Sequence, residues 1–255
     1  MIADLLAHHS TRALILLVAA AFVASLARGF SGFGGALIFV PLASAVVGPR
    51  WAAPLLLMID SVSAAGLVPN AWRCATRREV GVMAAGALLG VPLGVWLLAK
   101  ADPLALRWGL AAVVTAALVL LVSGWRYRGR RTRPVAAGVG LVGGVLSGTA
   151  QIGGPPIAAY WLSSALSPQA VRANLVLYFA ISTVFSAVAY LAGGLLTWGL
   201  LVLALLIGPA YALGMFAGSR LFGVASETTF RWLCYALIAI ATVLSLPILD
   251  SVLGR

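Results

Sequence analysis

The chain has 255 residues, of which 62% are hydrophobic and 9% are charged, whereas soluble domains are about 45–50% apolar and about 25% charged. A soluble enzyme and a disordered chain are therefore excluded, and the composition predicts a protein that lies almost entirely in a lipid bilayer. The net charge of +11 indicates arginines on cytoplasmic loops and no nucleic-acid partner, because no soluble stretch is long enough for a nucleic-acid-binding module.

Apolar segments follow one another along the chain, five in each half. They lie at 13–27, 36–48, 51–71, 81–99, 104–123, 135–147, 155–166, 169–192, 198–219 and 228–248. The last three of each half have about 20 residues, which is enough to cross a bilayer as a helix. The first two are shorter and meet at a glycine-rich break. The sequence thus predicts an all-α polytopic membrane protein with two short segments and three full transmembrane helices in each half.

A basic stretch at 124–134 separates the halves and ends in a proline, which is typical of a cytoplasmic linker. We expect a first repeat at 1–123 and a second repeat at 135–255, within one membrane domain. The run at 13–27 resembles a signal peptide, but it has a counterpart inside the chain, so we assign it to the mature fold.

A shift of 119 residues places the two halves in register. It brings Gly34 and Gly35 onto Gly153 and Gly154, and Ser63 onto Ser182. Such a repeat indicates a duplicated transporter-like architecture. The basic loop at 73–78 corresponds to an uncharged loop in the second half, which favours opposite sides of the membrane and therefore inverted repeats. Parallel halves stay open, as does the choice between a re-entrant hairpin and five spans per half.

The two breaks are the candidate binding site. A helix that begins inside the membrane presents free N–H groups and the positive end of its dipole, which favour an anion. We expect the anion between the two breaks, held by residues of both halves: Arg28, Ser31, Gly32, Gly34, Gly35, Gln151, Gly153, Gly154, Arg172 and Asn174. The alternative is that these glycines only allow close helix packing.

The polar candidates each have a second interpretation. Arg28 either binds the anion or extends to the interface, and Arg172 and Asn174 either bind it or flank a helix. Gln151 either donates to an oxyanion or caps a helix end. Asp60 is the one acid near the middle of a full span, where it either carries a proton or pairs with an arginine such as Arg28. The sequence predicts no catalytic group, no metal site and no cofactor.

The motifs at these breaks resemble the TauE/SafE family of sulfite and organosulfonate exporters. The similarity rests on residues 29–41 and on the block 148–174, which contains Gly-Gly-Pro-Pro at 153–156, then Tyr160, then Arg-Ala-Asn at 172–174. The resemblance implies a multi-pass permease of the bacterial inner membrane that moves small sulfur-containing anions.

The leading hypothesis is export of sulfite or a small organosulfonate by alternating access between the two repeats. The partners would be the anion and the lipid bilayer, and the sequence leaves the oligomeric state open. The alternative is a membrane scaffold or accessory subunit that transports nothing. An intramembrane enzyme is disfavoured because the spans contain no nucleophile–base pair.

Overall fold

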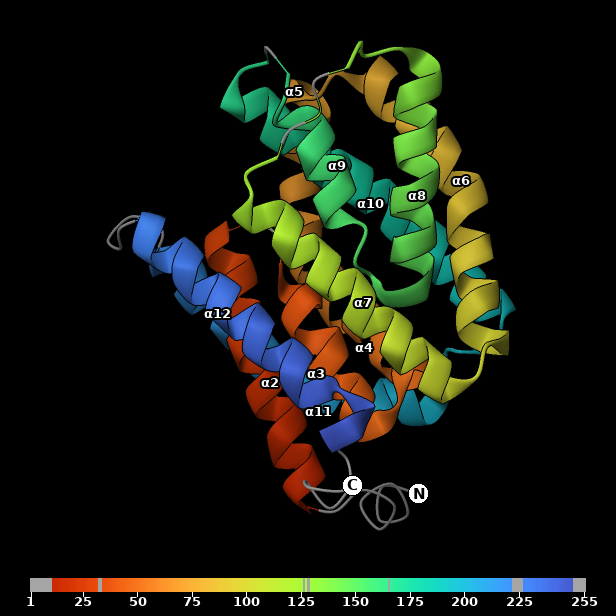
Figure 1. The fold of residues 1–255 in the computed structure, drawn as a ribbon, viewed down its shortest axis with the longest axis vertical. Coiled ribbons are helices and arrows are strands. Elements are labelled where there is room, and N and C mark those ends of the chain that lie inside the picture. Colours follow the sequence, from red (N-terminus) through yellow and green to blue (C-terminus); the bar gives the residue numbers. More distant parts are fainter. Residues whose placement is uncertain are drawn as a thin grey trace. The chain divides into compact units, whose positions relative to one another are not determined.

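The computed structural model describes residues 11–31, 34–125, 127, 129–164, 166–221 and 227–249, and all regular structure in these ranges is helical (Figure 1). The helices are α2 (Thr11–Ser31), α3 (Gly35–Val47), α4 (Pro49–Ala64), η1 (Ala65–Leu67), α5 (Val68–Cys74), α6 (Arg77–Lys100), α7 (Pro103–Val122), α8 (Arg133–Ala150), α9 (Gly154–Trp161), α10 (Pro168–Ala192), α11 (Trp198–Leu221), α12 (Glu227–Ser245) and η2 (Pro247–Leu249). Five of those described, α2, α6, α7, α10 and α11, contain stretches long and apolar enough to cross a membrane. The predicted all-α polytopic class is confirmed.

The helix bounds differ from the apolar runs at two kinds of place. The first helix of each half is longer than its run, because α2 continues through Arg28 to Ser31 and α8 reaches back to Arg133. A polar residue at a helix end does not stop the helix, so a hydropathy limit underestimates its length. The segment predicted at 51–71 is divided by η1, which contains Gly66 and precedes Pro69.

The described helices form two compact units, and each unit takes helices from both halves of the sequence. Unit 1 comprises Met1–Asp60, Ala101–Leu118 and Leu195–Arg255, and unit 2 comprises Ser61–Lys100 and Val119–Gly194. In unit 1 the first helix of the first half, α2, packs on the fourth helix of the second half, α11. In unit 2 the pairing is reciprocal, with α8 on α6. This exchange supports the internal duplication, while the inverted direction and the repeat limits stay predictions.

Glycines bring α6 and α8 into backbone contact in unit 2. At each of six positions a Cβ atom would collide with the backbone of the partner helix: Gly86, Gly90, Gly94, Gly140, Gly144 and Gly148. Several large side chains of α6 face outward, and among them Leu89 and Trp96 are 70% and 57% exposed. Small residues inside and large ones outside are typical of membrane helix pairs, because lipid already surrounds apolar side chains and tight packing drives association.

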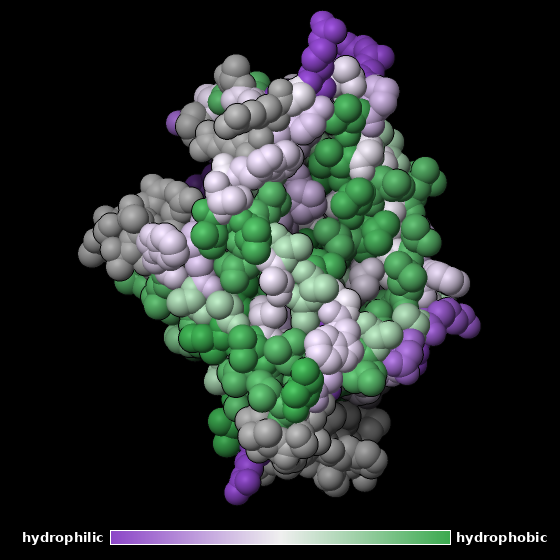
Figure 2. Space-filling model, viewed as in Figure 1, coloured by the Kyte–Doolittle hydropathy of each residue, from purple (hydrophilic) through white to green (hydrophobic). Residues whose placement is uncertain are grey.

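The same packing holds α2 against α11 in unit 1. Gly214 and Gly218 lie against the backbone of Phe22 and Leu26, and Gly29 lies against α11 at Met215. The helix α12 packs on α3 in the same unit. Apolar residues cover much of the exposed surface (Figure 2), which agrees with a surface that faces lipid.

Two neighbouring glycines of α8 test this packing. A Cβ atom at Gly140 would lie on the carbonyl of Met83, whereas nothing lies within 4 Å of a Cβ atom at Gly138. We expect Gly140→Ala to destabilise the protein by about 1–3 kcal/mol through overpacking. Gly138→Ala should be neutral or stabilise it by up to about 1 kcal/mol through helix propensity. Melting temperatures in detergent check both, and an equal change in the two variants would contradict the interlocked α6–α8 pair.

Candidate functional site

The first break lies between α2 and α3 in unit 1. Gly34 precedes α3 with φ 98°, a left-handed conformation that favours glycine, and its carbonyl accepts a hydrogen bond from the Leu37 amide at 3.0 Å. Among the described residues no side chain caps this helix end, and no acid lies in its first turn. Of the predicted ligands here, Gly32 lies outside the described residues and only the backbone of Ser31 is described.

Arg28 lies beside the start of α3. A Cβ atom on Gly35 would be 3.1 Å from both the carbonyl oxygen of Ala24 and the Cβ of Arg28. Glycine at 35 therefore lets the first turn of α3 lie on the stem of the arginine. The free N–H groups of α3 and the guanidinium are therefore two groups at this break that attract an anion.

A carboxylate and a tyrosine complete the first break. The Nε of Arg28 forms an ion pair with Oδ1 of Asp60 on α4, and the Tyr211 hydroxyl donates to the same oxygen at 2.7 Å. The side chains of Arg28 and Asp60 are 19% and 20% exposed, while Tyr211 on α11 is fully buried. Of the two sequence interpretations of Asp60, the structure shows the ion pair.

At the second break, in unit 2, side chains satisfy the end of α8. The helix α8 ends at Gln151, the one non-glycine residue in the described ranges with a left-handed backbone, at φ 58°. Its side-chain amide donates to the Ser147 carbonyl at 2.9 Å and to the Tyr190 hydroxyl at 3.3 Å. Tyr190 in turn donates to the Gly148 carbonyl at 2.8 Å. The structure thus shows Gln151 as a helix cap, with both amide hydrogens engaged.

The two glycines that open α9 have different surroundings. A Cβ atom on Gly153 would lie 2.5 Å from the Gly143 carbonyl oxygen, so this position needs glycine for close packing on α8. A Cβ atom on Gly154 would meet only the Phe179 ring, at 3.7 Å, which is an ordinary contact. Packing therefore explains Gly153 but leaves Gly154 free for another purpose.

Arg172 and Asn174 lie near the start of α10, away from Gln151. Arg172 is exposed, and 18 residues of helix separate it from Tyr190, or about 27 Å at 1.5 Å per residue. Asn174 is completely buried, and its Oδ1 accepts the Thr76 amide at 2.7 Å, immediately before α6. Asn174 therefore joins α10 to the start of α6, and its Nδ2 has no partner among the described residues.

A second polar cluster, which sequence reasoning did not single out, fixes the other end of α9. The Tyr160 hydroxyl donates to Oε1 of Glu79 at 3.0 Å, and Nη2 of Arg131 lies 3.4 Å from the same oxygen. The Arg131 guanidinium also stacks 4.5 Å from the centre of the Tyr160 ring. The basic linker is thereby attached to α9 and to the start of α6. The sequence signal that could have indicated this cluster is Glu79, a single acid directly after two arginines.

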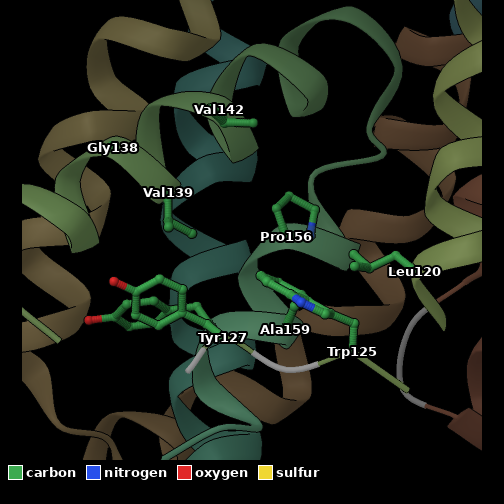
Figure 3. A pocket seen from close by; sticks show the side chains of 9 residues that line it. Leu120, Trp125, Tyr127, Gly138, Val139, Val142, Pro156 and Ala159 are labelled. Atoms are coloured by element: carbon green, nitrogen blue, oxygen red, sulfur yellow. The ribbon is translucent and has the colours of Figure 1, made fainter. Parts of the chain in front are cut away.

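An apolar cavity lies next to this cluster (Figure 3). It has a volume of about 290 Å³ and is lined by Leu120, Trp125, Tyr127, Gly138, Val139, Val142, Pro156, Ala159 and Tyr160. Aliphatic and aromatic groups form nearly all of its wall. A small anion would lose its hydration there without gaining charged partners, so the cavity does not fit the predicted ligand.

The opening glycines of α9 provide a matched test. Gly153→Ala should lower the melting temperature, corresponding to about 1–3 kcal/mol of overpacking against α8. Gly154→Ala should leave the melting temperature nearly unchanged, because its Cβ atom has room. If Gly154→Ala unfolds the protein as readily as Gly153→Ala, the described geometry of the second break is wrong.

Comparison with known proteins agrees with this architecture. The family model described as sulfite exporter TauE/SafE matches residues 17–245, which include both breaks, all of unit 2 and most of unit 1. No curated protein and no solved structure matches the chain. The chain therefore belongs to the sulfite exporter TauE/SafE family, and it is a membrane transporter of small sulfur-containing anions rather than an enzyme.

Proposed function

We propose that the protein exports sulfite or a small organosulfonate across the bacterial inner membrane, and that the anion binds at the first break. The observation that carries this proposal is the position of Arg28, a cation beside the uncapped, glycine-started N-terminus of α3. An arginine within a transmembrane helix is costly and is functional by default. A helix N-terminus adds directed N–H donors for an oxyanion.

The chemistry of a sulfur oxyanion matches these groups. Sulfite and sulfonates present several oxygens that accept hydrogen bonds, and an arginine fork can bind two of them at once. A guanidinium carries five N–H donors, which is more than a single carboxylate can accept. Arg28 therefore keeps N–H donors for the anion while it is paired with Asp60. Asp60 then balances the arginine when no anion is bound.

The second break contributes differently to this proposal. The side chain of Gln151 is engaged in capping, so it is not assigned a contact with the anion, and the contributions of Gly153 and Gly154 stay predictions. The contributions of Arg172 and Asn174 stay predictions, and the Thr76 contact of Asn174 favours a structural role. The two repeats would expose the site alternately to the two sides of the membrane.

The membrane potential supplies the driving force. With the inside negative, exit of one negative charge is favoured by about 2.3 kcal/mol per 100 mV. Export of an anion therefore needs no coupling ion.

Sulfite flux in proteoliposomes tests the proposal. We expect the wild type to release trapped sulfite and Arg28→Ala to reduce the rate by about tenfold or more, since a charge-assisted contact is lost. Arg28→Lys should recover only part of the rate, because lysine keeps the charge but lacks the fork.

Arg220→Ala is the matched control, because it also removes one arginine from unit 1. Arg220 is exposed near the end of α11, where its guanidinium lies 4.8 Å from the centre of the Phe216 ring. Its removal should leave flux unchanged. No flux from folded wild-type protein would favour the scaffold alternative, and full flux in Arg28→Ala would exclude the first break as the binding site.

A further inference from the structure

We infer that Asp60 is a charge filter, which restricts the anion site to monovalent anions such as sulfonates and bisulfite and disfavours dianions such as sulfate. This inference rests on the proposed function, because it assumes that Arg28 binds the transported anion. It concerns the role of Asp60, the ion-pair partner of Arg28, rather than the role of Arg28 itself.

Asp60 is held in place from two helices. Arg28 on α2 and Tyr211 on α11 both contact its Oδ1 atom. The buried hydroxyl of Tyr211 has Asp60 as its hydrogen-bond acceptor, so the carboxylate cannot turn away from the arginine without leaving that hydroxyl unpaired. The acid is therefore a fixed part of the break.

The described residues of the helices that form this break, α2, α3, α4 and α11, place no other charge beside the pair. The helix α3 has no titratable side chain, and besides Tyr211 the titratable group of α11 is Arg220, stacked on Phe216. On α4, Arg50 lies ten residues before Asp60, or about 15 Å along the helix, and its Nη2 donates to the Ala101 carbonyl at 3.2 Å. The net side-chain charge at the break is therefore zero when both groups are ionised.

This neutrality determines which anion the site accepts. A monoanion that binds Arg28 brings the local side-chain and ligand charge to −1, and a dianion brings it to −2. The Asp60 carboxylate repels each additional negative charge on the ligand. This repulsion is strong because the local dielectric constant is far below that of water. The partial positive charge at the start of α3 compensates for about half a unit, which suits a monoanion. Without Asp60 the same site would carry +1 and would accept a dianion.

Titration of melting temperature in detergent tests the filter, with methanesulfonate as the monoanion and sulfate as the dianion at constant ionic strength. A ligand that binds the folded state raises stability according to its dissociation constant. In the wild type we expect tighter binding of methanesulfonate. In Asp60→Asn the ratio of the sulfate to the methanesulfonate dissociation constant should fall by about tenfold or more.

Two further variants and one control accompany this measurement. Tyr211→Phe keeps both charges but removes the hydrogen bond that holds the Asp60 carboxylate. The ratio of the sulfate to the methanesulfonate dissociation constant should therefore fall, but by less than in Asp60→Asn. Arg28→Ala measures the unspecific stabilisation that sulfate gives to any folded protein. Asp102→Asn is the matched control, because Asp102 caps α7 by accepting the amides of Leu104 and Ala105, and asparagine also caps well. The ratio of the two dissociation constants in Asp102→Asn should equal that of the wild type.

The outcomes separate the inference from the proposed function. An unchanged ratio in Asp60→Asn, or loss of methanesulfonate binding in that variant while it stays folded, would overturn the filter and leave anion binding at Arg28 standing. The second result would make Asp60 a required ligand or proton carrier. If Asp60→Asn does not fold, Tyr211→Phe decides in the same way. No binding of either anion by the wild type, together with no sulfite flux, would overturn both.

Discussion

A bilayer core offers no water to an unpaired peptide group, and this constraint explains why the two helix breaks differ. Each break frees backbone N–H and C=O groups that must be satisfied within the protein. At the second break the side chain of Gln151 and the hydroxyl of Tyr190 satisfy the end of α8. Among the described residues no side chain caps the N-terminus of α3 or of α9, but Arg28 lies beside α3. Positions that match in sequence therefore have different chemistry, since an ion pair lies at the first break and a capping glutamine at the second.

Glycine packing provides the stable frame around both breaks. In each unit the first helix of one half lies against the fourth helix of the other, with glycines at the contact. Gly29 and Gly148, which are 119 residues apart, both lie against backbone of the partner helix. Such helix pairs have little room for side-chain rearrangement, so a transporter built from them is expected to move helices as bodies rather than to deform them. Of the glycines that the sequence left open between packing and binding, packing explains Gly153 but not Gly154.

The cluster of Arg28, Asp60 and Tyr211 joins the fold to the transport chemistry. An arginine without a partner would destabilise the empty transporter, and a carboxylate without one would do the same. Their ion pair removes both problems, and it leaves guanidinium donors for an arriving oxyanion. We propose that the same carboxylate, which Tyr211 holds in place, also sets the charge of the anion that the site accepts. On this proposal, stability and selectivity depend on one interaction.

The amino-acid sequence by itself determined the membrane location and the helical class and located both breaks, because these depend on composition, run length and glycine spacing along the chain. It also predicted the duplication, which the exchange of helices between the two units supports. It pointed to Arg28 and Asp60 because charges are rare in apolar spans. It left undecided whether Gln151 caps or binds, and it missed Tyr211, Tyr190 and the Glu79–Arg131–Tyr160 cluster. Those roles depend on hydrogen bonds between residues 39 to 151 positions apart, which only the packing of α4, α6, α8, α9, α10 and α11 decides. A helix end can be read from neighbouring residues, but the partner of a buried polar group is set by whichever helix lies against it.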